Sequence, residues 1–245
     1  MSSRLPGADV RRLFNVTQPT RDRFNWWYSR HQEVALHALG HTALAVNRIT
    51  SAEAWEVFRR DWLAAALTSR GEPVLEIDDW RPAFTFPHVF HHVVERMERL
   101  PGWPDLRAFC ADDEQASAMV WLPALALVEE VKGRGVDSEV ARAAMQRRVG
   151  RAYAEFVREA YMAAYFREQG LAVVAHPLAR AAFHVDAWVG RVVLNLHAGA
   201  HRSEEMLFQA MPPFFFESVP GLEHNDGLPS TRQLDIVVRR LSPAP

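Results

Sequence analysis

The sequence predicts an α+β protein, in which an N-terminal helical region precedes a small mixed sheet flanked by helices. Three observations lead to this class. Apolar residues recur at helical spacing through most of the first 150 positions, and a long apolar stripe covers 137–169. After Gly170 the pattern changes to short runs with strand-like alternation. The Lys132–Gly135 segment is the clearest linker, so the sequence predicts a helical domain over 1–135 and an α/β domain over 136–245.

The helical segments are bounded by ordinary start and stop signals. A serine cap begins the helix at Ser51, a proline begins the helix at Pro87, and Gly170 ends the longest helix. Pro123 predicts a kink inside its helix. The expected helices are 25–47, 51–67, 87–100, 112–131, 137–169 and 201–210.

The strand-like segments are short and mostly follow Gly170. In 191–198, Val192, Leu194 and Leu196 alternate with Val193, Asn195 and His197, which is typical of a strand. A short extended piece is expected near 74–80. The expected strands of the second domain are 171–176, 181–188, 191–198, 213–219 and, last in the chain, 234–241.

Composition and charge narrow the class of protein. The chain of 245 residues has 49% hydrophobic residues, 24% charged residues and a formal net charge of −2, which argues against a strongly basic nucleic-acid binder. No apolar run reaches the length of a membrane span, and no signal peptide is visible at the N-terminus. Cys110 is the only cysteine, so an intrachain disulfide is impossible. We therefore expect a cytoplasmic protein without membrane association.

One acid, Asp186, lies in the second expected strand, just before a tight turn at Gly190. The order of elements from 137 is helix, three strands, helix, strand, and the helix carries Glu159 and Glu155. Asn195 and His197 follow two residues apart on the third strand. This arrangement resembles the core of the PD-(D/E)XK nuclease superfamily over roughly 150–240.

The resemblance implies a metal-dependent nuclease with a restriction-endonuclease-like core. In this family a helix acid and a second-strand acid bind Mg²⁺ or Mn²⁺, which here would be Glu159 (or Glu155) and Asp186. The third-strand positions, usually Glu or Gln followed by Lys, fall on Asn195 and His197. Asn195 could then give a carbonyl oxygen to the cation, and His197 could activate the attacking water.

The chain departs from the family at both third-strand positions. Its only lysine, Lys132, precedes the whole unit, and arginine is too basic to act as a general base. Two interpretations therefore stay open for Asp186: half of a metal-binding pair, or an acid near a hairpin that accepts hydrogen bonds from backbone amides.

Two further clusters allow a functional and a structural interpretation. His31, His37 and His41 lie near one another on one expected helix, and His88, His91 and His92 lie on another, so that Zn²⁺ or iron could bind. Histidines on a helix surface or in the core, with hydrogen-bond partners, are the favoured alternative. The cluster Asn25–Tyr28 lies among Arg21, Arg23 and Arg30; such aromatics could stack on bases, although burial in the core is favoured. The His201–Ser203 segment could hold an anion at a helix start.

The consecutive residues Phe214, Phe215 and Phe216 cannot all face one side of a strand. We therefore expect a protein partner or a second copy of the chain to cover a surface near 211–219.

The sequence leads to two hypotheses about function. The first is a PD-(D/E)XK-like protein that processes or binds DNA or RNA, either active or catalytically degenerate, in the bacterial defence or mobile-element context that the resemblance implies. The second is a non-catalytic scaffold or binding subunit of a protein complex.

Overall fold

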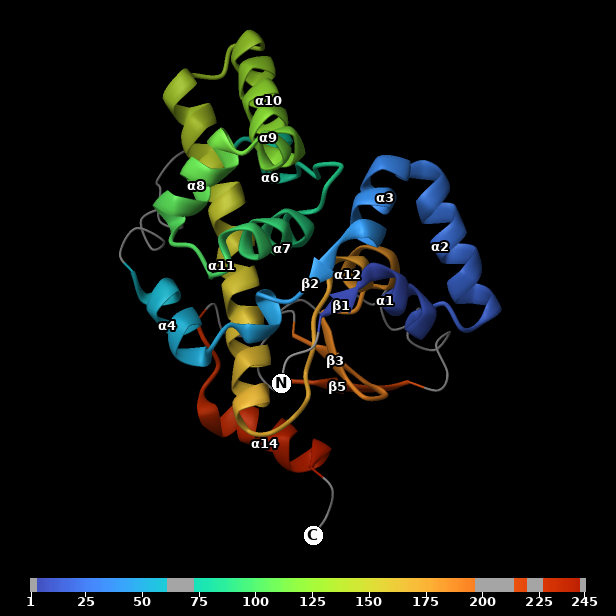
Figure 1. Ribbon diagram of the computed structural model, residues 1–245. Coiled ribbons are helices and arrows are strands. Elements are labelled where there is room, and N and C mark those ends of the chain that lie inside the picture. The colour runs from blue at the N-terminus through green and yellow to red at the C-terminus, as the bar shows by residue number, and fades with distance from the viewer. Residues whose placement is uncertain (1–3, 61–72, 197–213, 220–226, 243–245) are drawn as a thin grey trace. The chain divides into compact units, whose positions relative to one another are not determined.

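The computed structural model describes residues 4–60, 73–196, 214–219 and 227–242 (Figure 1). The chain forms two compact units, of which unit 1 comprises Met1–Trp55 and Arg158–Pro245 and unit 2 comprises Glu56–Val157. The described residues are mostly helical and include two small sheets, so the α+β class is confirmed. The units differ from the expected division at 135, because the 31-residue helix α11 (Ser138–Glu168) contributes to both.

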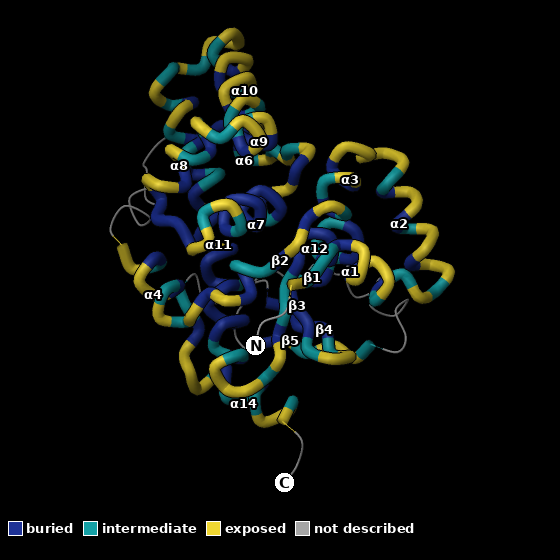
Figure 2. The backbone as a smooth tube through the Cα atoms, in the orientation of Figure 1, coloured by how far each residue is buried: buried dark blue, intermediate teal, exposed yellow. Residues whose placement is uncertain are grey.

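Unit 2 is helical throughout its described part. Helix α7 begins with Pro87 in its first turn and is buried along almost its whole length, as Figure 2 shows. The expected extended piece near 74–80 is wrong, because residues 75–78 form a helical turn. The helices are α6 (Leu75–Asp78), α7 (Phe86–Met97), α8 (Trp103–Asp112), α9 (Glu114–Ala116), η2 (Ser117–Trp121) and α10 (Leu122–Gly133).

The helix expected over 112–131 is irregular just before Pro123. Segment η2 is a turn of π-helix, and α10 continues from Leu122. Proline has no backbone N–H, so one carbonyl in the preceding turn loses its usual partner, and a wider turn accommodates the ring. At the place where Pro123 predicts a kink, the helix thus contains a π-turn.

The N-terminal part of unit 1 contains more elements than the sequence predicts. The single helix expected over 25–47 is wrong: two helices meet at His31, whose φ of −133° is not helical. Phe24 and Trp27 on the first helix and Ala38 on the second are all buried. The elements are β1 (Leu5–Pro6), α1 (Gly7–Phe14), α2 (Gln18–Arg30), α3 (Gln32–Gly40), β2 (Thr42–Ala43), η1 (Val46–Arg48) and α4 (Ser51–Arg59).

Unit 1 contains an antiparallel pair, β1–β2, and a three-stranded sheet that is mixed, as expected. Strands β3 (Ala187–Val189) and β4 (Val192–Asn195) form an antiparallel hairpin, and β5 (Phe215–Ser218) lies parallel to β4. Gly190 allows the tight turn because its φ is +55°, which side-chain-bearing residues adopt reluctantly. Phe14 of α1 packs edge-on against Trp188 with ring centroids 5.0 Å apart, so α1 contacts β3.

Two of the expected strands are partly wrong, because a helix lies between them. Helix α12 (Pro177–Phe183) occupies the start of the 181–188 segment, and His184 ends it in a left-handed conformation. In 171–176 the described residues form only a bridge between Val174 and Trp188. The backbone N–H and C=O of Ala175 instead bind the side-chain amide of Asn47, at 2.8 and 3.1 Å.

The strand expected over 234–241 is also wrong, because these residues belong to helix α14 (Thr231–Leu241). Ser230 and Gln233 form a capping box at its start, and Leu234 and Val237 are buried at helical spacing. The helix expected over 201–210 lies outside the described residues. Across the described part of the chain, no helix is long and apolar enough to cross a bilayer.

Candidate functional site

The predicted carboxylates Glu159 and Asp186 meet at a guanidinium. One nitrogen of Arg180, Nη1, donates to Glu159 Oε1 at 3.0 Å and also contacts Asp186 Oδ1. All three side chains are largely buried, with exposed fractions of 13% for Glu159, 10% for Asp186 and 21% for Arg180. The two carboxylates that the sequence analysis pairs therefore lie next to each other, since both contact the same nitrogen.

The second oxygen of Asp186 binds the backbone. Leu196 N–H donates to Asp186 Oδ2 at 2.9 Å. This contact joins the residue before β3 to the residue after β4, and it extends the hairpin beyond its ladder. Asp186 therefore accepts a backbone amide, as the structural interpretation of this residue requires.

The other predicted site residues are Asn195, Glu155 and His197, and they differ in where they lie. Extending the β3–β4 register by one position places Asn195 opposite Asp186, on the same face of the hairpin. Glu155 is exposed on α11, and Glu159 is the helix acid that reaches Arg180. His197 lies outside the described residues.

These residues do not fit a magnesium site as they are arranged. Mg²⁺ requires oxygen ligands and keeps several waters, whereas Arg180 donates hydrogen bonds into the space between the two carboxylates. Arg180 supplies the positive charge that the prediction assigned to a cation. Within the described segments, no group of three His, Cys, Asp or Glu residues is placed to hold a metal ion.

Sequence reasoning missed Arg180, because it missed the helix that carries this residue. The available signal was Pro177 directly after His176: proline is common in the first turn of a helix, and His176 caps the helix by accepting from Leu178 N–H at 3.0 Å. A helix over 177–183 places Arg180 one turn after Pro177, near the strand that begins at Ala187.

The histidines of the two clusters differ in burial, since His31 is exposed and His37 is partly buried. His41, His88, His91 and His92 are all buried. His92 lies 3.5 Å from Asp113, and burial lowers its pKa although Asp113 opposes the shift.

The aromatic cluster of α2 divides into a buried and an exposed part. Trp27 belongs to the core, and Arg23 donates to the Ala182 carbonyl at 2.9 Å. Trp26 is 54% exposed, and the Arg30 guanidinium lies 4.7 Å from the centre of its ring. Trp26 and Arg30 therefore form an exposed cation–π pair on one face of α2.

The consecutive phenylalanines Phe214 and Phe215 also differ in burial. Phe214 packs against Phe14 with ring centroids 5.0 Å apart, whereas Phe215 is 70% exposed. Strand β5 pairs with β4 on one side, and none of the other described strands pairs with it.

The comparisons with known proteins found no matching family model, no similar curated protein and no similar solved structure.

Proposed function

We propose that this chain is a nucleic-acid-binding protein with a PD-(D/E)XK-like core in which the carboxylate pair stabilises the fold and does not support hydrolysis. The observation that carries this proposal is the contact of Arg180 with both Glu159 and Asp186. An arginine in this place neutralises the acids that would otherwise hold the cation.

The chemistry of the neighbouring positions supports the same conclusion. Hydrolysis of a phosphodiester needs a group that orients or deprotonates water. Arginine is too basic to deprotonate water, and asparagine has no titratable group, so neither Arg180 nor Asn195 can act as the base. The proposal therefore assigns Asp186 to the hairpin, through Leu196, and to the ion pair with Arg180.

Two features of the N-terminal segment support nucleic acid as the ligand. Residues 1–40 contain six arginines and three acids, although the whole chain has a net charge of −2. The exposed pair of Trp26 and Arg30 combines a stacking surface with a cation, which is the combination used by proteins that bind single strands.

The test is fluorescence anisotropy with labelled single-stranded DNA, single-stranded RNA and duplex DNA. We expect saturable, salt-dependent binding that weakens roughly tenfold in Trp26→Ala, because stacking on one base contributes about 1–3 kcal/mol. Trp55→Ala is the matched control, since Trp55 is another exposed tryptophan of unit 1. Absence of binding to all three probes, or equal losses in the two variants, would contradict the proposal.

A second candidate function is a scaffold subunit that assembles through β5. The specific observation in its favour is Phe215, an exposed aromatic on a strand with one described neighbour. Such a strand edge can pair with another chain, and the exposed ring adds apolar area to that contact.

A further inference from the structure

Unit 2 contains a pocket of about 520 Å³ that takes no part in the proposed nucleic-acid binding. Small-molecule sites typically have volumes of about 300–1,000 Å³ and often lie between helices of a bundle. The pocket is lined by residues of α7, α8, η2, α10 and α11. Its apolar lining includes Trp103, Leu106, Val120, Ala124, Val128 and Val149.

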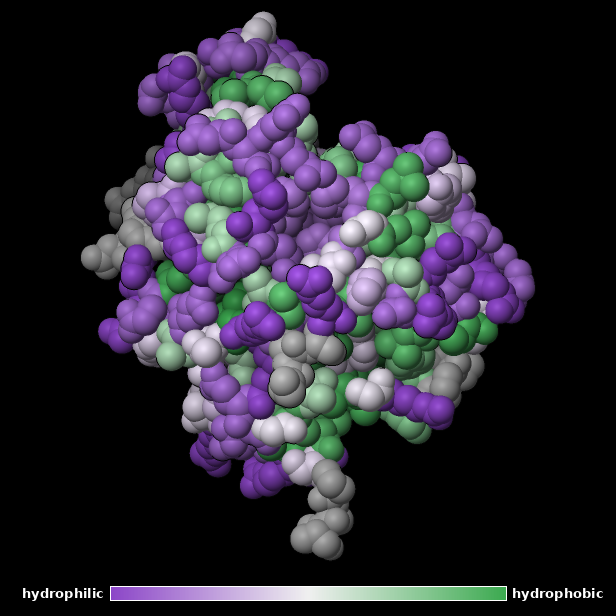
Figure 3. Space-filling model, viewed as in Figure 1, coloured by the Kyte–Doolittle hydropathy of each residue, from purple (hydrophilic) through white to green (hydrophobic). Residues whose placement is uncertain are grey.

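The pocket is next to the irregular π-turn. Segment η2 ends at Trp121, which lines the pocket together with Leu125 of the following turn. Turns of π-helix are rare and occur frequently at functional sites. Leu122 and Leu125 are exposed, and Figure 3 shows hydrophobic atoms among hydrophilic ones over α10. The helix therefore exposes apolar side chains beside the pocket.

Cys110 belongs to the apolar part of the lining. Burial, aided by the charge of Asp113, raises the pKa of its thiol to about 12. The thiol is therefore protonated near neutral pH and behaves as a small apolar group. Because Cys110 is the only cysteine of the chain, it also provides a single chemical reporter inside the pocket.

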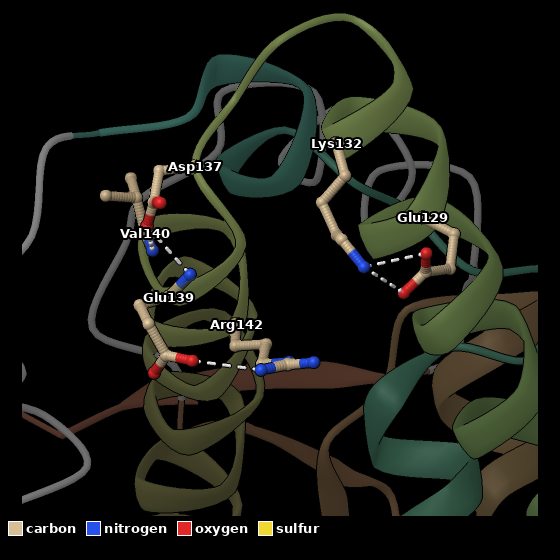
Figure 4. Close-up of polar contacts among 6 residues, drawn as sticks. All are labelled: Glu129, Lys132, Asp137, Glu139, Val140 and Arg142. Carbon is tan, nitrogen blue, oxygen red and sulfur yellow. Dashed lines mark hydrogen bonds and ion pairs between the residues drawn. The ribbon is translucent and has the colours of Figure 1, made fainter.

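The charges at the pocket are mostly paired within their own helices. Lys132 donates to Glu129 at 2.7 Å on α10, and Arg142 donates to Glu139 at 2.9 Å on α11, as Figure 4 shows. Arg107 differs from these residues, because no carboxylate of the described residues forms an ion pair with it. The rim therefore has a surplus of positive charge at Arg107.

Arg107 lies on the same face of α8 as the apolar lining. It follows Trp103 by one turn and precedes Cys110 by three residues, so the three side chains project from neighbouring positions on the helix surface. Its stem can cover apolar surface while the guanidinium meets water. The face thus combines an apolar region with one exposed hydrogen-bond donor group that suits a carboxylate.

We propose that this pocket binds a small amphiphile with an apolar body and a single carboxylate, which Arg107 binds at the rim. The apolar lining recognises the body by excluding water, and the guanidinium of Arg107, which has no ion pair among the described residues, recognises the acid. This proposal is independent of nucleic-acid binding, because it involves other residues in unit 2.

The experiment is isothermal titration calorimetry of the full chain with decanoate, 1-decanol and decylammonium, each below its solubility limit. We expect decanoate to bind roughly tenfold more tightly than 1-decanol, because it gains a hydrogen bond between charged groups. Decylammonium should bind more weakly than either. As a second measurement, decanoate should slow the labelling of Cys110 by iodoacetamide, followed by intact mass over hours at about pH 9, because the buried thiol reacts only through its small thiolate fraction.

Two variants separate the apolar and the charged parts of the site. Ala143→Trp places a large ring in the pocket from a partly exposed position on α11, and we expect it to abolish binding of both decanoate and 1-decanol. Arg107→Gln should bring decanoate to the affinity of 1-decanol and leave 1-decanol unchanged. The controls are Ala126→Trp on α10 and Arg151→Gln on α11, both exposed and outside the lining.

Circular dichroism of each variant establishes that it is folded before it is titrated. Three results would overturn the proposal: no saturable binding of decanoate to the wild type, equal affinity for decanoate and 1-decanol, or unchanged binding in a folded Ala143→Trp variant. If Ala143→Trp does not fold, the labelling of wild-type Cys110 decides the location, and an unchanged rate at saturating decanoate would exclude this pocket.

Discussion

The guanidinium of Arg180 contacts the carboxylate of Asp186, six residues further along the chain. This contact links the short helix α12 to the start of the β3–β4 hairpin. Because the same nitrogen also binds Glu159 of α11, one arginine connects three elements of unit 1. The residues predicted to hold a metal ion are thereby given a structural role.

We expect Arg180→Met to lower the free energy of unfolding by about 3 kcal/mol, because two largely buried carboxylates would lose their counterion. Urea denaturation measures this change. The control is Arg142→Met, which removes a pair between exposed side chains and should cost less than about 1 kcal/mol. Similar losses in the two variants would mean that the Arg180 pair contributes little.

We expect His176 to make stability depend on pH. It is fully buried, its Nδ1 accepts from Leu178 N–H, and its Nε2 lies 3.3 Å from the His41 carbonyl. Burial lowers its pKa from 6.5 to about 4, so below pH 6.5 the unfolded chain binds a proton that the folded chain excludes. Stability is therefore complete above pH 6.5 and is lost as the pH falls toward 4, by about 3 kcal/mol.

Urea denaturation between pH 7.5 and 4 tests this prediction, with His176→Asn as the comparison. Asparagine can cap a helix but does not titrate in this range, so the variant should show a shallower pH dependence. Parallel curves for the two proteins would contradict the assignment to His176.

Gly7→Ala should destabilise the protein by about 2 kcal/mol, because a Cβ at this position would overlap the chain of α3. The new atom would lie 2.7 Å from the carbonyl oxygen of Leu39, and the backbone there cannot move freely, since Gly7 N–H binds the His41 carbonyl at 2.9 Å. Thermal unfolding measures the loss. Gly133→Ala is the control, because a Cβ there meets nothing within 4 Å, and its stability should be unchanged or slightly raised.

Phe215→Asp should reduce self-association if β5 is an interface between two copies of this chain. Multi-angle light scattering over a range of concentrations gives the oligomeric state. Leu36→Asp, which changes an exposed apolar residue on α3, should leave the oligomeric state as in the wild type. A wild-type protein that is monomeric at every concentration would rule out this interface between copies.

The elements that the sequence predicted well are those with strong local signals. Helix α11 has a long apolar stripe and ends at Glu168, two residues before Gly170, whose φ is +88°, and helix α7 has a proline in its first turn. The β3–β4 hairpin was expected because its residues alternate around Gly190. In each case the nearby sequence determines the structure, so no tertiary information is needed.

The errors arose where tertiary contacts decided between alternatives. Ala175 satisfies its backbone groups on Asn47, far away in the sequence, and therefore does not need a neighbouring strand. For α14, the β-branched run at 236–238 suggested a strand, whereas the capping box at Ser230 was the overlooked helix signal. The proximity of Glu159 and Asp186 was predictable from the resemblance, but the arginine between them depended on the missed helix α12.

The central claim is that Asp186 forms an ion pair with Arg180 and does not support metal-dependent hydrolysis. The most direct measurement incubates the full chain with labelled DNA and RNA in the presence of Mg²⁺ or Mn²⁺, beside Asp186→Ala and Arg180→Gln. We predict no cleavage by any of the three proteins, together with lower thermal stability of both variants. Cleavage by the wild type that disappears in Asp186→Ala would contradict the account and restore the metal-dependent nuclease.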